Sequence, residues 1–495
     1  MGREIERDHF SEHDYERFQR RLREDLDALG ELLARPGLGV LPLTMGAELE
    51  LHLVDREGRA HAGSARVLDI ANDDRLKPEV AKYNVELNSR PVALRGRPFG
   101  ALAAELHELI ARVRTAAADD GARPVAIGIL PTATTSDLAE NMTTDANRYR
   151  ALARGIRRLR PDPGTVRIEG CDGAALDLLT GGVACQGACT SFQVHLRVCP
   201  DEFASVYNAA LLAAGPVLAV SANSPLFLGR ELWDETRIAL FAQGAFDVRR
   251  HDERWRPPRV SFGNGWCTSG ILELFADSIA RHAPLLPAVG DESPSRMVAA
   301  GGAPKLDHLR LHQGTVWPWN RAVYDDADGG HVRIEMRFLP AGPTVIDMVA
   351  NAAFIIGLSL GLARDVERYK AQMTFAHARR NFLQAARRGL DAELLWPSPL
   401  TPFPRAHDAC SLVADLLPTA RAALVDAGAR EDEVDSLLGV IASRVAARQT
   451  GASWQRRVYR RTRKRRGAEE AQRAVLESYM AHSDREVPVH EWATE

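Results

Sequence analysis

The stretch Met45-Gly-Ala-Glu-Leu-Glu-Leu-His-Leu53 alternates apolar and polar side chains at nearly every position. In a β-strand, residues two apart point to the same face of the sheet. One face of this strand therefore carries apolar side chains, and the other carries Glu48, Glu50 and His52. The stretch predicts a strand that packs on the core with one face and presents carboxylates and an imidazole on the other.

Three later stretches repeat this alternation. Their polar faces carry Asn84, Glu86 and Asn88 in residues 83–88, Gln193, His195 and Arg197 in residues 191–198, and His331, Arg333, Glu335 and Arg337 in residues 331–338. A half-solvated antiparallel sheet alternates in the same way, so one such strand does not indicate a site. The residue types do, because carboxylates bind divalent cations and guanidinium groups bind phosphate in a bidentate manner. The four stretches together indicate metal-assisted phosphate chemistry on one face of a sheet.

The composition restricts the kind of phosphate site. The 495-residue chain has 63 basic and 66 acidic residues, a formal net charge of −3. Its lysines are Lys77, Lys82, Lys305, Lys370 and Lys464, and none of them follows a glycine. A P-loop needs Gly-Lys followed by Ser or Thr, so a P-loop NTPase is excluded. The balanced charge gives no general attraction to nucleic acid or to an acidic membrane.

The four stretches, in this order, resemble the glutamine synthetase and glutamate–cysteine ligase superfamily, and most closely the bacterial type 2 glutamate–cysteine ligases, also called carboxylate–amine ligases. Val220-Ser-Ala-Asn-Ser-Pro-Leu-Phe-Leu-Gly229 is similar to that family's Ser-Ala-Asn-Ser-Pro segment. Arg333-Ile-Glu-Met-Arg-Phe-Leu-Pro340 is similar to the Arg-Ile-Glu-x-Arg-Phe strand of glutamine synthetases. The resemblance covers about residues 41–365. It implies an α+β fold in which a curved, mainly antiparallel sheet of about six strands forms an active-site funnel flanked by helices.

The resemblance also implies an activity: an ATP-dependent ligase that joins a carboxylate to an amine through an acyl-phosphate, with Mg²⁺ or Mn²⁺. By motif position, the expected metal ligands are Glu48, Glu50, Glu86, His195 and Glu335. The expected catalytic residues are Glu335, Arg337 and, as a second candidate beside the phosphate, Arg333. The expected nucleotide- or substrate-binding residues are Asn88, Gln193, Arg197, Arg237, Trp319 and Arg321. Trp319 and Arg321 share a face if residues 316–321 form a strand, and they equally fit a core tryptophan beside a surface arginine.

The sequence departs from the family pattern at several positions. Leu49 replaces the middle of three consecutive acids, and Gln193 replaces the first histidine of a paired-histidine strand. Arg197 replaces a glycine, and Leu339 follows at a position where an acid is common. The metal and phosphate residues are retained while substrate-facing positions differ, so the substrate pair need not be glutamate and cysteine. Two alternatives stay open: a guanidino kinase of the phosphagen type, and a catalytically decayed nucleotide-binding protein.

Three regions are expected along the chain: an N-terminal helix in residues 1–40, a catalytic domain in residues 41–365 and a helical C-terminal region in residues 366–495. Beyond about residue 365 no strand pattern is apparent. The helices expected there are residues 365–389, 406–427, 431–449 and 453–481. The basic run 456–466 fits a solvated helix face or an internal contact with acids better than nucleic-acid binding.

The most apolar run, Val345–Ala363, contains Asp347 and Asn351, so a buried helix is expected in place of a membrane span. The first residues show no apolar stretch of a secretory signal. We therefore expect a cytoplasmic enzyme with small-molecule carboxylate and amine substrates, without a nucleic-acid or membrane partner, and with homo-oligomerisation left open.

Overall fold

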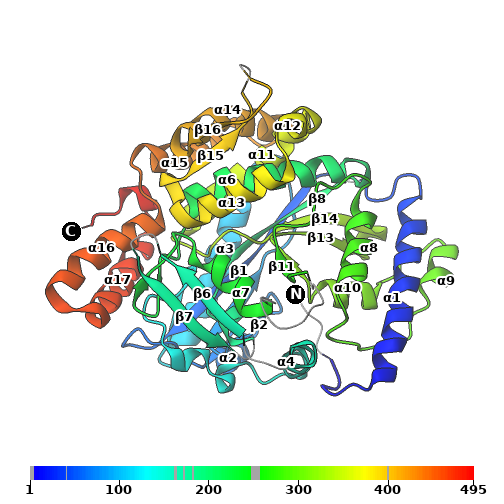
Figure 1. Cartoon of the computed structure of the whole chain (residues 1–495), viewed down its shortest axis with the longest axis horizontal. Helices are drawn as coiled ribbons and strands as arrows, with labels where there is room; N and C mark the ends of the chain where they lie inside the picture. Colours follow the sequence, from blue (N-terminus) through cyan, green and yellow to red (C-terminus); the bar gives the residue numbers. More distant parts are fainter. Residues whose placement is uncertain are drawn as a thin grey trace.

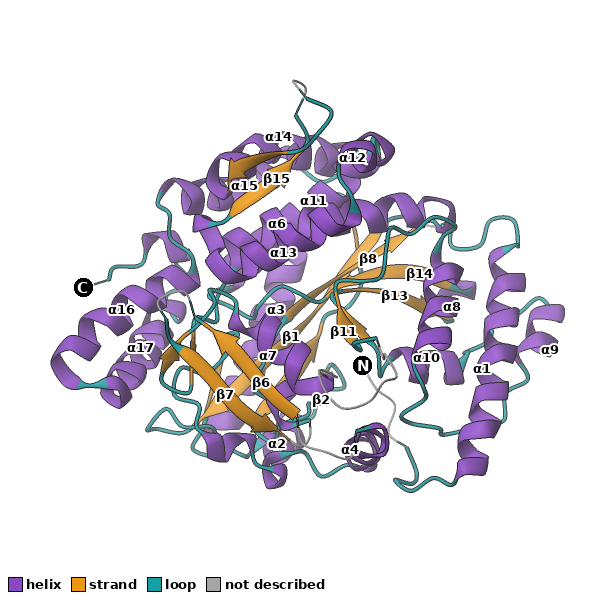
Figure 2. Ribbon diagram, viewed as in Figure 1, coloured by secondary structure: helices purple, strands orange, loops and turns teal. Residues whose placement is uncertain are grey.

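The computed structural model describes residues 5–40, 42–160, 164–170, 173–180, 183–246, 257–398 and 401–494. A curved antiparallel sheet passes through its centre (Figures 1 and 2). The strand order is β13 (Asn320–Asp325), β14 (His331–Met336), β8 (Phe192–Val198), β1 (Thr44–Val54), β3 (Asn84–Asn88) and β2 (Leu76–Pro78). Two short strands, β4 (Val92–Ala93) and β5 (Arg123–Val125), also pair with β1. The expected α+β fold with a sheet of about six main strands is confirmed.

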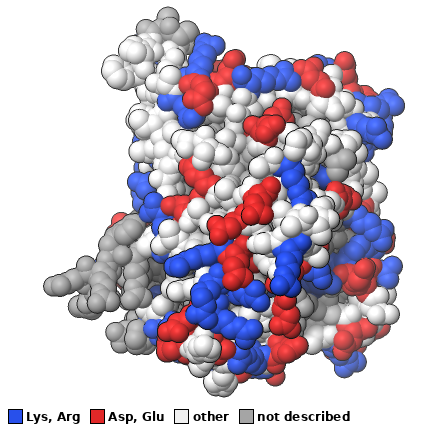
Figure 3. Space-filling model, turned by 90° about the vertical axis from the view of Figure 1, so that its right-hand side faces the viewer, with Lys and Arg blue, Asp and Glu red and all other residues white. Residues whose placement is uncertain are grey.

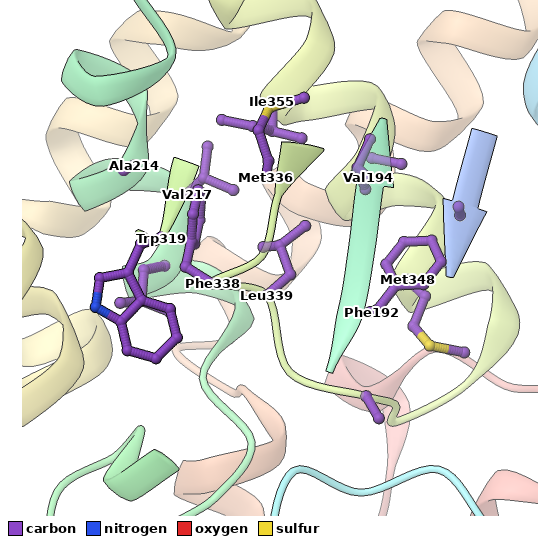
Figure 4. Close-up of a cluster of buried hydrophobic side chains, with 14 of the residues drawn as sticks. Phe192, Val194, Ala214, Val217, Trp319, Met336, Phe338, Leu339, Met348 and Ile355 are labelled. Carbon is purple, nitrogen blue, oxygen red and sulfur yellow. The ribbon is translucent and has the colours of Figure 1, made fainter. Parts of the chain in front are cut away.

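The apolar face of the sheet packs against two long helices, α6 (Phe203–Ser221) and α11 (Val345–Ala363). Figure 4 shows Val194 and Met336 from the sheet together with Val217 and Ile355 from these helices. Residues 200–221 and α11 are long and apolar enough to span a membrane, but 89% and 83% of their apolar windows are buried inside the chain. Helix α11 is therefore a buried core helix in this structure, as its polar residues predicted.

The N-terminal helix α1 (Glu12–Leu33) packs against α8 (Ile271–Arg281), α9 (Pro294–Ala299) and α10 (Asp307–Gln313) at one end of the sheet (Figure 1). Ser11 and Asp14 form a capping box at the start of α1, which satisfies free backbone N–H groups of its first turn. The remaining helices before residue 365 are α2 (Ser64–Ala71), α3 (Pro98–Ala118), α4 (Asn147–Leu159), α5 (Ala184–Gly187) and α7 (Thr236–Phe246). The remaining strands there form the pairs β6 (Gly164–Glu169) with β7 (Ala175–Thr180), β9 (Leu226–Phe227) with β10 (Arg230–Glu231), and β11 (Val260–Ser261) with β12 (Trp317–Pro318).

The C-terminal region is mainly helical, with three differences from the sequence expectation. Its helices are α12 (Val366–Gln372), α13 (Phe375–Arg388), α14 (Ala409–Asp426), α15 (Glu431–Ala446), α16 (Gly451–Arg466) and α17 (Ala468–Ser483). The single helix expected over residues 365–389 was wrong, because extended backbone at Met373 and Thr374 divides it into two helices. The expectation of no strands was wrong, because β15 (Glu393–Trp396) and β16 (Arg405–Asp408) form a hairpin. The single helix expected over residues 453–481 was also wrong. Gly467, with φ +87°, adopts a conformation that ends α16 and starts α17.

The basic run in α16 makes internal contacts with acids, as expected. Arg456 donates to Asp234 at 2.9 Å, and Arg460 donates to Glu231 at 2.7 Å. The opposite side of the molecule, seen in Figure 3, also has basic and acidic side chains interspersed. The ion pairs of Arg456 and Arg460 therefore stabilise the packing of α16 against residues 231–234, which precede α7.

Candidate active site

The register of the sheet brings the four polar strand faces together. Glu50 of β1 lies opposite Glu86 of β3, and Glu335 of β14 lies opposite His195 of β8. Directly opposed residues in an antiparallel sheet share a face, with side chains about 5 Å apart. Because β8 lies between β14 and β1, side chains from four strands converge on one surface.

Glu48, His195 and Glu335 form the first acid group. Each offers a ligand atom, and these atoms lie within 4.8 Å of one another. His195 Nε2 lies 3.2 Å from Glu48 Oε1. Within the described residues, that Nε2 and the buried Glu48 Oε2 have no hydrogen-bond partner. Burial alone would raise the pKa of Glu48, but the adjacent His195 lowers it to about 2. Two buried polar atoms without a partner suit a bound cation.

Glu50, Glu79 and Glu86 form the second acid group, and their ligand atoms also lie within 4.8 Å of one another. Burial, followed by the charge of Glu86, raises the pKa of Glu79 well above its usual range and that of Glu50 to about 7. Three crowded carboxylates repel one another unless a proton or a cation lies among them. The donor set is the one that Mg²⁺ prefers.

Glu79 is a residue that sequence reasoning missed. It directly follows Pro78 at the end of β2 and so lies outside the alternating stretches. Because Lys77 of β2 lies opposite Glu86 of β3, the residues that follow Lys77 run beside β3. The one signal in the sequence was that Glu79 lies a few residues before the strand that contains Glu86. Acidic residues near a strand are too common for this position to indicate a site.

Arg337 and Gln193 connect the two acid groups. Arg337 donates to Glu335 in the first group and, at 2.5 Å, to Gln193 Oε1. Gln193 Nε2 in turn donates to Glu50 Oε1 in the second group at 3.0 Å. The substitution of glutamine for a histidine thus places an amide where it accepts from Arg337 and donates to Glu50 at once.

Arg321 lies close to Glu335. Its Nη2 donates to Glu335 Oε1 at 3.0 Å, and its Nε donates to Oε2. Burial would raise the pKa of Glu335, but the guanidinium groups of Arg321 and Arg337 hold it well below its usual range. Arg321 thus neutralises Glu335 in this structure, and its expected contact with a substrate stays a prediction.

The other expected residues lie along the same sheet face. Arg333 donates to His195 Nδ1 at 3.2 Å and to Asp325 at 3.2 Å, and Asn88 donates to Glu86 at 2.9 Å. Arg333 therefore orients His195 of the first acid group, and Asn88 orients Glu86 of the second. Arg197 forms an ion pair with Asp328 at 2.9 Å.

A cavity of about 440 Å³ opens beside the second acid group. Its lining includes Arg237, Trp319 and Arg337 of the expected residues, with Glu50 and Glu86. Trp317, Trp319 and Phe241 supply an aromatic wall, and the Arg237 guanidinium lies 5.6 Å from the centre of the Trp319 ring. Lys77 and Arg148 add positive charge to the lining. The cavity thus joins carboxylates, guanidinium groups and aromatic rings in one space.

Comparisons with known proteins show which family and which solved structures this chain resembles. Residues 44–261 match the family model of glutamate-cysteine ligase family 2. A Salinispora arenicola (strain CNS-205) protein, provisionally named glutamate–cysteine ligase 2, is 28% identical over 446 residues, which cover 87% of this chain and 93% of the relative.

Two solved structures were matched to this chain. One is the glutamate–cysteine ligase from Francisella tularensis in complex with AMP, with a TM-score of 0.51, 10% identity and coverage of 92% of this chain and 90% of that one. The other is a bifunctional glutathione synthetase from Pasteurella multocida, with a TM-score of 0.48, 12% identity and coverage of 92% and 54%. The first of these supports the expected fold class. The family recognised from the strand motifs is supported, because residues 44–261 match the model of glutamate–cysteine ligase family 2, and the chain is an ATP-dependent ligase.

Proposed function

We propose that this chain uses ATP to phosphorylate a substrate carboxylate and then joins the acyl group to an amine. The observation that carries the proposal is the pair of acid groups on one sheet face, connected by Arg337 and Gln193 beside a cavity of about 440 Å³. Small-molecule carboxylates and amines are the expected partners, and a cytoplasmic location stays a prediction.

The residues fit divalent cations such as Mg²⁺ or Mn²⁺. Glu48, His195 and Glu335 would hold one ion, and Glu50, Glu79 and Glu86 a second. When bound, such ions neutralise the negative charge of the ATP phosphates and of the transferred phosphoryl group. Asn88 and Arg333 hold ligands of these two sets in place through hydrogen bonds to Glu86 and His195.

In the first step, an oxygen of the substrate carboxylate attacks the γ-phosphorus, and the bond to the ADP oxygen breaks. Arg337 lies between the two acid groups and stabilises the charge that spreads over the phosphoryl oxygens. In the second step, the amine nitrogen attacks the acyl carbon, inorganic phosphate leaves, and a proton of the amine goes to solvent. Arg237 in the cavity lining suits a carboxylate of the substrate, because its planar guanidinium can bind one in a bidentate manner.

The test is ADP release by the purified chain with ATP, Mg²⁺ and pools of carboxylates and amines, with products identified by mass spectrometry. ADP formation should require both a carboxylate and an amine, and the product should be their amide. With hydroxylamine in place of the amine, an acyl-phosphate yields a hydroxamate. A stable phosphoramidate would identify a guanidino kinase, and ATP hydrolysis that no second substrate stimulates would contradict the proposal.

Replacing Glu79 tests the second metal site. Glu79→Gln removes one of three carboxylates from the group and should raise the half-saturating Mg²⁺ concentration by roughly tenfold or more. The measurement is ADP formation against Mg²⁺ concentration. Glu105→Gln is the matched control, because Glu105, on α3, forms an ion pair with Arg75, and its substitution should leave the Mg²⁺ dependence unchanged. An unchanged half-saturation in Glu79→Gln would exclude Glu79 as a ligand.

Metal binding should depend on pH through Glu50. Burial and Glu86 raise the pKa of Glu50 from 4.5 to about 7, so between these values the metal-free native state keeps a proton that the unfolded chain has lost. The stability of the metal-free protein therefore falls as pH rises through this window. Metal displaces the proton, so Mg²⁺ should raise Tm more at pH 8 than at pH 6. Thermal unfolding with and without Mg²⁺ checks this, and Glu50→Gln should remove most of the difference; equal shifts in the unaltered chain would refute it.

A further inference from the structure

A fully buried carboxylate, Glu235, joins two segments behind the cavity. It accepts hydrogen bonds from the Asn223 backbone N–H at 2.8 Å, from Ser224 Oγ at 2.8 Å and from Arg237 Nε at 3.1 Å. Glu235, Asn223 and Ser224 have no exposed surface. A buried carboxylate with three donors holds them in one geometry, because any of them left without a partner would be costly.

Arg237 connects this carboxylate with the end of β14. Its Nη1 lies 3.5 Å from the backbone oxygen of Arg337, to which it donates, and its Nη2 donates to the backbone oxygen of Phe338. Arg237 is 3% exposed and lines the cavity. Glu235 thus positions Arg237, and Arg237 in turn holds the backbone at Arg337, another arginine that lines the cavity.

The C-terminal helices reach the same network through Asn223. Gln455 Nε2 of α16 donates to Asn223 Oδ1 at 2.9 Å. Asn223 Nδ2 donates to Tyr479 Oη of α17 at 2.8 Å and to the backbone oxygen of Ala341 at 2.7 Å. Tyr479 Oη donates in turn to the backbone oxygen of Ala126 at 2.8 Å. The Asn223 side chain is therefore bound on each of its polar atoms.

The start of α16 lies unusually close to this amide. A Cβ atom at Gly451 would lie 2.0 Å from Asn223 Oδ1, which no side chain could accommodate without a shift. The Ala452 backbone N–H also donates to the Ala222 oxygen at 2.9 Å. Helix α16 thus packs directly on the turn that carries Asn223.

We propose that helices α16 and α17 position Arg237 in the cavity through Asn223 and Glu235, so that Gln455, Tyr479, Asn223 and Glu235 are positioning residues for substrate binding. The part that concerns substrate rests on the proposed function, in which Arg237 binds the substrate carboxylate. The coupling itself rests on the hydrogen bonds alone. Loss of a contact between Asn223 and a C-terminal helix should loosen the segment of Arg237, although the substituted residue does not line the cavity.

Tyr479→Phe tests the proposal, with Tyr459→Phe as the matched control. Both tyrosines are fully buried in the C-terminal helix pair, but Tyr459 donates to the Gly229 oxygen, and within the described residues no hydrogen bond joins it to Asn223. Amide hydrogen exchange of the peptides 233–240 and 335–342 should be faster in Tyr479→Phe than in Tyr459→Phe, with similar Tm in both. Equal exchange in the two variants would overturn the proposal, and this result does not depend on any catalytic activity.

A second test measures steady-state kinetics with the carboxylate and amine pair that gives an amide product. Tyr479→Phe should raise KM for the carboxylate about fivefold and leave kcat almost unchanged, whereas Tyr459→Phe should change neither. Glu235→Gln, which keeps an acceptor but loses the charge, should raise the same KM more strongly. If the unaltered chain forms no amide with any pair, the proposed function fails and hydrogen exchange alone decides the coupling. Faster exchange with an unchanged KM would refute the assignment of Arg237 to the substrate.

Discussion

Glu335→Gln should lower ADP formation by at least about 10³-fold while the chain keeps its secondary structure. Glu335 offers a ligand atom to the first acid group and accepts hydrogen bonds from both Arg321 and Arg337. Loss of its charge would remove a proposed metal ligand and leave the two buried guanidinium groups of Arg321 and Arg337 without their carboxylate. Initial-rate measurements at saturating Mg²⁺, with circular dichroism of the variant, check this expectation.

Glu335→Gln should also destabilise the fold, so the control should be a substitution that lowers the free energy of unfolding by a similar amount. Breaking a buried ion pair costs about 3–5 kcal/mol. Asp347→Asn is suitable, because Asp347 is fully buried on α11 and bonds to Arg444 at 2.8 Å within the helical part of the molecule. It should lower Tm to a similar extent but leave kcat unchanged. Full activity of Glu335→Gln would exclude Glu335 as a metal ligand.

Arg337→Lys should lower kcat by about 10²–10³-fold, with a smaller change in KM for ATP. One guanidinium nitrogen of Arg337 donates to both Glu335 and Gln193, which fixes the plane of the guanidinium group between the two acid groups. A lysine ammonium is a compact point charge and cannot keep this planar arrangement of donors. Steady-state kinetics over a range of ATP concentrations separates the two parameters.

The control for Arg337→Lys is Arg310→Lys, because Arg310 forms an ion pair with Asp326 and does not line the cavity. Its kinetics should match those of the unaltered chain. A change in KM for ATP alone would show that Arg337 binds the ground state and does not act selectively on the transition state. A kcat close to that of the unaltered chain would remove Arg337 from the mechanism.

The alternating stretches were sufficient to predict the strands and their polar faces, and the ligase class followed from the resemblance of their motifs to a known family. A strand period of two residues is a local property, so Glu48 and Glu50 could be assigned to one face from the sequence alone. The same reasoning treated Glu48, Glu50, Glu86, His195 and Glu335 as one set of ligands. The structure separates them into two groups, because the Glu48 carboxylate lies near His195 and Glu335, whereas the Glu50 carboxylate lies near Glu79 and Glu86.

Residues outside the alternating stretches were harder to assign. Glu79 enters the site only through the pairing of β2 with β3. Arg321 was singled out for a contact with nucleotide or substrate, which stays a prediction, and only the pairing of β13 with β14 places it against Glu335. In the C-terminal region the hairpin β15–β16 has only four residues in each strand, too few for a clear period, and the break at Gly467 depends on a positive φ angle.

The sequence by itself determined which side chains share a strand face, the kind of ligand they offer and the exclusion of a P-loop. Tertiary structure alone decided which strands are neighbours, how the ligands divide into two groups and where the C-terminal helices contact the turn of Asn223. The physical reason is the range of the interactions. Side-chain direction follows from the local backbone, whereas strand order and register follow from burial of the apolar face against helices distant in the sequence, α6 and α11.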